Sequence, residues 1–168
     1  REILKTNRDK PLVLVDFGGM VSFSFLRLAG SPEFRQLVEK GKLVFVVSSI
    51  DFTIEDGIRN AGRGLNELDR DDVAFILKNK DYVNYVKADA AELRNTRIQS
   101  RFTGKEINLS GNIDILCERY ALKHGVKNDV DLYLLAKMMS EDGVMFIGAS
   151  TVQPISGLEE DFSINRDI

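Results

Sequence analysis

The fold class is decided by the stretch Leu12–Gly19, LVLVDFGG. Four apolar residues are followed by Asp16, Phe17 and a Gly-Gly turn. A short apolar run of this kind is typical of a strand buried on both faces of a parallel sheet. In open α/β sheets, ligands bind at the carboxyl ends of the strands, so Asp16 marks the edge where we expect a site.

Four further apolar runs have the character of buried strands. Acids again follow two of them, at Asp89 and at Glu118, and glycine ends the last. Because the carboxyl ends of parallel strands meet at one edge of a sheet, these residues are expected to lie near Asp16. The four runs are Leu43–Val47, Tyr82–Lys87, Asn112–Cys117 and Gly143–Gly148.

Helices are predicted between these strands from capping residues and apolar periodicity. Ser31 followed by Pro32 is a typical helix start, and Gly41 is a typical stop. Residues 51–68 are expected to form a long loop, and residues 90–109 stay ambiguous. The other predicted helices begin in Met20–Ala29, follow Asp69 with Val73, Ile76 and Leu77 buried, and run from Asn128 to Met139.

The alternation of strands and helices predicts an α/β fold with a doubly wound, mostly parallel sheet and helices on both faces. We expect the Rossmann-like strand order 3-2-1-4-5, with a switch point between the first and fourth strands. Residues 1–168 are interpreted as a single domain. Since the chain begins at Arg1 rather than Met, it can also be a fragment of a longer chain.

The composition excludes few functions. With 43% hydrophobic and 29% charged residues the chain has the profile of a globular protein, and no run approaches the length of a membrane span. The net charge of −3 gives no global signal for nucleic acid or for an anionic membrane. One cysteine and one histidine exclude an internal disulfide, disfavour a metal site, and favour a reducing, cytoplasmic location.

The loop after the first strand reads DFGGMVS over residues 16–22. It resembles the loop of class I S-adenosylmethionine-dependent methyltransferases, in which an acid precedes three glycines at alternate positions. Asp16 and Gly18 match, whereas Met20 and Ser22 stand where the other two glycines would be. Matches at Val86–Ala90, Asn112–His124 and Asp129–Gly143 extend the resemblance over most of the chain.

The resemblance implies that S-adenosylmethionine binds at the strand ends and leaves as S-adenosylhomocysteine. Asp89 and the N–H of Ala90 would then contact the adenine. The acid that the family carries at the tip of the second strand is absent, so Ser48 or the later Asp51 would take the ribose. In full, the implied cofactor residues are Asp16, Gly18, Gly19, Met20, Ser48, Asp51, Asp89, Ala90 and Cys117, and the implied catalytic residues are Glu118, Tyr120 and His124.

Each of these residues also has a purely structural interpretation, and the sequence leaves both open. Asp89 is equally suited to cap a helix that begins at Ala90. Asp16 is a common turn residue, and Cys117 is a small core hydrophobe. The alternatives on the catalytic side are a solvated carboxylate for Glu118, a packing ring for Tyr120 and an exposed helix end for His124.

A basic run lies inside the ambiguous segment. Its members recur at spacings of three and four, and on a helix they would form one stripe. Such a stripe can hold an acidic or phosphate-bearing substrate, or can be a solvated face. The run consists of Arg94, Arg97, Arg101 and Lys105.

Three functions fit this sequence. The first is a methyltransferase that acts on an unidentified acceptor, with the cofactor supplying the chemistry. The second is a methyltransferase-like domain without activity, used for binding or assembly, which Met20 and Ser22 motivate. The third, a dinucleotide oxidoreductase, is weakened because no Gly-x-Gly-x-x-Gly follows the first strand. The methyl acceptor and the oligomeric state are not indicated by the sequence.

Overall fold

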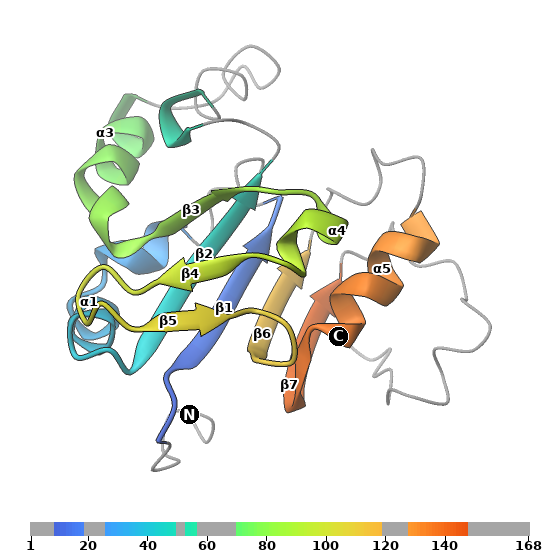
Figure 1. Ribbon diagram of the computed structural model, residues 1–168. Helices are drawn as coiled ribbons and strands as arrows, with labels where there is room; N and C mark the ends of the chain where they lie inside the picture. The colour runs from blue at the N-terminus through green and yellow to red at the C-terminus, as the bar shows by residue number, and fades with distance from the viewer. Residues whose placement is uncertain (1–8, 19–25, 50–52, 57–69, 119–127, 148–168) are drawn as a thin grey trace.

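Figure 1 shows the computed structural model of the chain, which describes residues 9–18, 26–49, 53–56, 70–118 and 128–147. A five-stranded sheet lies at its centre, in the order β3-β2-β1-β6-β7, and every pairing in it is parallel. The predicted α/β class and strand order are therefore confirmed. The strands are β1 (Leu12–Phe17), β2 (Leu43–Ser49), β3 (Asn84–Lys87), β6 (Ile113–Glu118) and β7 (Met139–Ile147).

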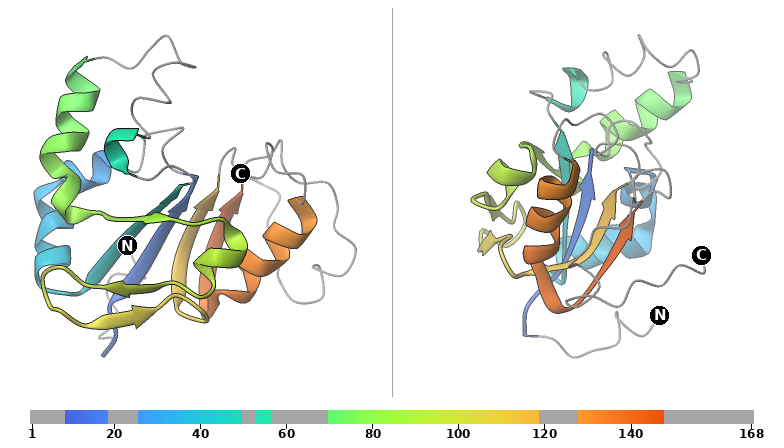
Figure 2. Two further views of the ribbon diagram at one scale, coloured as in Figure 1. Left: turned by 45° about the horizontal axis from the view of Figure 1, so that its top comes forward. Right: turned by 90° about the vertical axis from the view of Figure 1, so that its right-hand side faces the viewer.

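Helical segments cover both faces of this sheet (Figure 2). The predicted start of the first long helix is confirmed, since the Ser31 hydroxyl accepts the N–H of Phe34 at 3.3 Å and Pro32 is the first helical residue. No helix in the described segments is long and apolar enough to cross a membrane. The helical segments are η3 (Leu26–Gly30), α1 (Pro32–Glu39), α3 (Arg70–Asn79), η4 (Lys80–Tyr82), α4 (Ala90–Leu93) and α5 (Asn128–Lys137).

Two apolar clusters hold the layers together. Alternate residues of β1 point to opposite faces, so Val13 and Val15 join one cluster and Leu12 and Leu14 join the other. The first cluster packs against α4 and α5, and the second packs against α1 and α3. The β1 strand is buried along its whole length, as its continuous apolar sequence predicts.

The ambiguous segment 90–109 is not one helix. Only α4 is helical, and a two-stranded antiparallel hairpin follows it, with β4 (Arg97–Gln99) paired to β5 (Glu106–Asn108). Gly104 turns the chain between them with φ +66°, a conformation that disfavours other residues. A helical basic stripe is therefore excluded, because Arg97 lies on a strand and Arg101 lies in the hairpin turn.

Several predicted boundaries shift. The third strand begins at Asn84 because the three residues before Val83 form the 3-10 turn η4. The last helix ends at Lys137, and β7 begins at Met139 rather than at Gly143. The pairing of β7 with β6 has a register shift after Ile113, and this irregularity accommodates the polar start of β7.

On α3, Ile76 is buried as predicted, whereas Leu77 is exposed.

Asp114 is a buried carboxylate at this register shift. Its Oδ2 accepts the main-chain N–H of Val13 at 2.9 Å, and its Oδ1 accepts the hydroxyl of Ser140 at 3.0 Å. Regular pairing of β1 with β6 begins one residue later, at Leu14 and Ile115. The Asp114 side chain thus replaces a main-chain hydrogen bond and links β1, β6 and β7 at the amino end of the sheet.

Candidate functional site

The carboxyl edge of the sheet brings together the ends of β1, β2 and β6. Asp16 lies beside Cys117, and Phe17 lies between Ser48 on one side and Glu118 on the other. The switch point of the strand order lies between β1 and β6, because β2 and β3 continue on one side and β7 on the other. The predicted placement of Asp16, Ser48, Cys117 and Glu118 at one edge is therefore what the structure shows.

The two acids of this edge lie on opposite faces of the sheet. Asp16 and Glu118 are each 1% exposed. Asp16 shares its face with Leu14 and Cys117, whereas Glu118 shares its face with Phe17. They therefore cannot act as a carboxylate pair on one ligand atom. Cys117 is 2% exposed and packs in the apolar cluster, as its structural interpretation predicts.

Gly18 follows β1 directly and has a conformation that glycine favours. Its φ is +72°, and its N–H donates to the carbonyl of Ser48 at 2.8 Å. This hydrogen bond between Gly18 and Ser48 extends the pairing of β1 with β2 by one residue beyond Phe17. A side chain at this position would be strained, so the turn after β1 favours glycine here.

Ser48 connects β2 to the segment after β3. Its hydroxyl is fully buried and donates to the carbonyl of Ala88 at 2.7 Å, while the N–H of Ala88 donates to the carbonyl of Ser49 at 2.9 Å. This pair of contacts fixes the chain just before Asp89. A ribose contact by the Ser48 hydroxyl would compete with its bond to Ala88, and it stays a prediction.

Asp89 is the N-cap of α4. Its Oδ1 accepts the N–H of Glu92 at 2.8 Å, and its own N–H donates to the Glu92 carboxylate at 3.1 Å, which completes a capping box. The structural interpretation of Asp89 is thus confirmed. The cap uses one carboxylate oxygen of an exposed side chain, so Oδ2 can still accept a ligand amine. Ala90 is the first residue of α4 and is fully buried.

Five of the implied site residues lie outside the described part of the chain. In the sequence they follow β1, β2 and β6. These residues are Gly19, Met20, Asp51, Tyr120 and His124.

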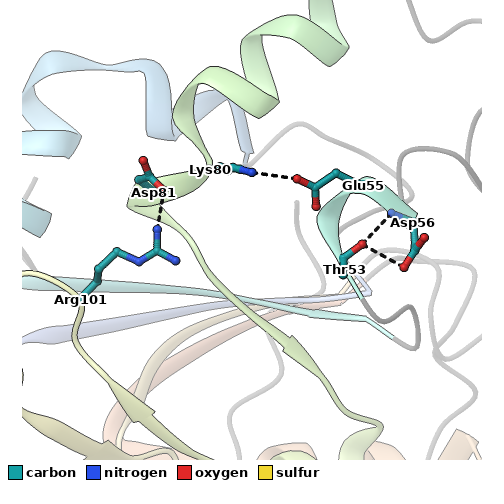
Figure 3. A network of polar contacts seen from close by, with 6 residues as sticks. All are labelled: Thr53, Glu55, Asp56, Lys80, Asp81 and Arg101. Atoms are coloured by element: carbon teal, nitrogen blue, oxygen red, sulfur yellow. Dashed lines mark hydrogen bonds and ion pairs between the residues drawn. The ribbon is translucent and has the colours of Figure 1, made fainter.

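A second feature was not predicted from the sequence. A groove of about 980 Å³ runs along the outer side of β3, between that strand and the hairpin. At one end of it Lys80 pairs with Glu55 at 2.9 Å, and Arg101 pairs with Asp81 (Figure 3). The hydrogen bond from Lys80 lowers the pKa of Glu55 below its ordinary value and raises the pKa of Lys80. The sequence signal near this groove is the spacing of basic residues around Arg101, in a segment whose secondary structure the sequence leaves ambiguous.

In the described part of the chain, neither the carboxyl edge of the sheet nor the groove along β3 supports a metal site. Among the described residues, no three His, Cys, Asp or Glu side chains come together in a way that could hold a metal ion.

No protein-family model matches the chain, and no curated protein matches it. Solved structures do resemble it. The CurJ carbon methyltransferase superposes with a TM-score of 0.50 at 10% identity, over 85% of this chain and 30% of that one. The citrinin polyketide synthase CMeT domain gives 0.47 at 9%, over 84% and 30%, and the cyclase SpnF gives 0.44 at 12%, over 87% and 42%. At such identities the likeness concerns the fold alone: the chain has a methyltransferase-like fold and spans less than half of each of these proteins.

Proposed function

We propose that this protein is an S-adenosylmethionine-dependent methyltransferase whose cofactor binds at the carboxyl edge of the sheet. The observation that best supports the proposal is the arrangement of residues at the end of β1. Asp16 and the positive-φ Gly18 stand there at the switch point, beside the ends of β2 and β6. The fold shared with the CurJ carbon methyltransferase supports the same assignment.

The described residues fit the cofactor at two points. Gly18 has no side chain to obstruct the methionine part, and Asp89 keeps Oδ2 as an acceptor for the exocyclic amine of adenine. Ser48 acts indirectly, since its bond to Ala88 sets the position of Asp89. Gly19, Met20, Asp51 and the N–H of Ala90 are proposed to complete the cofactor site, together with the wall formed by Cys117.

When bound, S-adenosylmethionine supplies an activated methyl group on a sulfonium, so the protein has to orient and to exclude water rather than to form a covalent bond. Glu118 stands at the end of β6, on the face opposite to Asp16. We assign it, with Tyr120 and His124, to the side of the acceptor. There a carboxylate can take the proton of a nucleophile that remains protonated at neutral pH.

Calorimetry with S-adenosylmethionine and S-adenosylhomocysteine tests this function. Asp89→Ser keeps an N-cap oxygen and removes the second acceptor, so the fold should persist while affinity falls about ten- to a hundredfold, because a hydrogen bond to a charged group is worth about 1.5–3 kcal/mol. Gly18→Val should abolish binding. Its matched control is Gly104→Val, which forces a similar positive φ in the hairpin, where a Cβ meets nothing within 4 Å.

The alternative function is a methyltransferase-like domain that binds partners without catalysis. Met20 and Ser22 favour it, because they replace two glycines of the family loop. If the folded protein binds neither compound, the enzyme proposal fails and this alternative takes its place. If it binds them but Gly18→Val and Gly104→Val weaken binding equally, the cofactor is not at the end of β1.

A further inference from the structure

We propose that Glu92 is a positioning residue for cofactor recognition, because its carboxylate holds Asp89 in the conformation in which that side chain meets the adenine. The inference rests on the proposed function, in which Asp89 contacts the exocyclic amine of the base. Glu92 acts through Asp89 and does not itself touch the cofactor.

Two reciprocal hydrogen bonds join these residues. The Glu92 carboxylate accepts the N–H of Asp89 at 3.1 Å, and the N–H of Glu92 donates to Oδ1 of Asp89 at 2.8 Å. Asp89 lies beyond the end of β3, so a side chain rather than a neighbouring strand accepts its N–H. The first bond fixes the main chain of Asp89, and the second fixes the rotation of its side chain. Together they commit Oδ1 to the cap and leave Oδ2 for the ligand.

The rest of the turn is anchored without the Glu92 carboxylate. Ala88 precedes Asp89 and is hydrogen-bonded to β2 through both its N–H and its carbonyl. Ala90 and Leu93 are fully buried in the apolar cluster on this face of the sheet. Removal of the carboxylate should therefore leave α4 in place, and its effect should be confined to the orientation of Asp89.

A fixed Asp89 matters because it is an exposed side chain. Binding through such a side chain normally includes the cost of ordering it, and a group that is ordered beforehand avoids this cost. Without the Glu92 carboxylate a single hydrogen bond holds Asp89, so other conformations compete with the one that presents Oδ2. The affinity for S-adenosylhomocysteine should then fall about two- to tenfold, the usual effect of leaving one side chain unordered.

Calorimetry with S-adenosylhomocysteine on the full chain tests this expectation. Glu92→Ala should show the two- to tenfold loss estimated above. Glu92→Gln should bind as the parent does, because an amide oxygen accepts the same N–H and completes the same capping box without the charge. The control is Glu106→Ala, which removes an exposed acid that pairs with Arg97 on the hairpin, and it should leave the affinity unchanged.

Two further measurements separate positioning from a general loosening of the turn. An analogue of S-adenosylhomocysteine whose base is unsubstituted purine lacks the exocyclic amine, so Glu92→Ala should not weaken its binding. In the Asp89→Ser background the second acceptor is already absent, and Glu92→Ala should cause no further loss for S-adenosylhomocysteine. A loosened turn would instead weaken both compounds, and would do so in both backgrounds.

Urea unfolding verifies that each variant is folded. Should Glu92→Ala not fold, Glu92→Asp takes its place, because the shorter side chain keeps the charge but falls short of the Asp89 N–H. An unchanged affinity of Glu92→Ala, a loss that Glu92→Gln shares, or an equal loss for the purine analogue or in the Asp89→Ser background would each overturn the proposal. If the parent protein does not bind S-adenosylhomocysteine, the proposed function itself fails, and this inference fails with it.

Discussion

Replacing Asp114 by alanine should destabilise the sheet. The substitution removes the acceptor of the buried Val13 N–H and that of the Ser140 hydroxyl. A buried donor without a partner costs about 1–3 kcal/mol, and the half-buried Ser140 hydroxyl can turn to water at a smaller cost. We therefore expect a loss of about 2–3 kcal/mol, within the 5–15 kcal/mol that a domain has in total.

Urea unfolding followed by circular dichroism measures this loss. With a slope of about 1–3 kcal/mol per molar urea, the midpoint of Asp114→Ala should fall by about 1 M. Ser140→Ala should lose only about 1 kcal/mol, because it removes one partner of the carboxylate. Asp142→Ala, an exposed acid on the same strand as Ser140, is the control and should stay within about 0.5 kcal/mol of the parent. The reasoning is refuted if Asp114→Ala is no less stable than Ser140→Ala.

Three further predictions concern single contacts. Gly18→Ala should lower the free energy of unfolding by about 1–2 kcal/mol, and Gly18→Asn by less, since Asn tolerates φ +72° better; equal losses in urea unfolding would argue against the backbone explanation. Ser31→Ala should cost about 1 kcal/mol through loss of the α1 cap, with Ser31→Asp as the variant that retains it. The hydrogen bond to Glu39 raises the pKa of Tyr82, so its stabilising effect is complete below pH 10 and is lost as the pH rises through the raised value. Glu39→Gln should move this tyrosine's ultraviolet titration to lower pH, and an unchanged titration would exclude the contact.

The sheet was predictable because its strands are buried on both faces. Leu12–Val15 and Leu43–Val47 are continuous apolar runs, and such runs have few alternatives to a central parallel strand. The Ser31 cap was equally local, since the signal and its hydrogen bond lie within four residues. The edge strand β3 was harder to predict. β3 is only half-buried and short, so its start was placed two residues too early, inside η4.

The hairpin and the bond network of Asp114 depend on contacts that are distant in sequence. Arg97 and Arg101 have the spacing of a helix, but the pairing of β4 with β5 and the burial of Ile98 decide the structure instead. Asp114 stands in an apolar strand and meets Val13, 101 residues away, so nothing near it in the sequence indicates its partner. Of the candidate site, the strand-end residues could be placed from the sequence, but the opposite faces of Asp16 and Glu118 required the register of β1 and β6.

The location of the cofactor tests the central claim most directly. Amide chemical shifts of the protein, recorded by NMR during a titration with S-adenosylhomocysteine, report which residues the compound approaches. We predict changes at the ends of β1, β2 and β3, namely at Gly18, Ser49 and Asp89, and none at Lys42 and Asn112 at the amino edge of the sheet. Changes confined to the amino edge, or no changes at any concentration, would contradict the account.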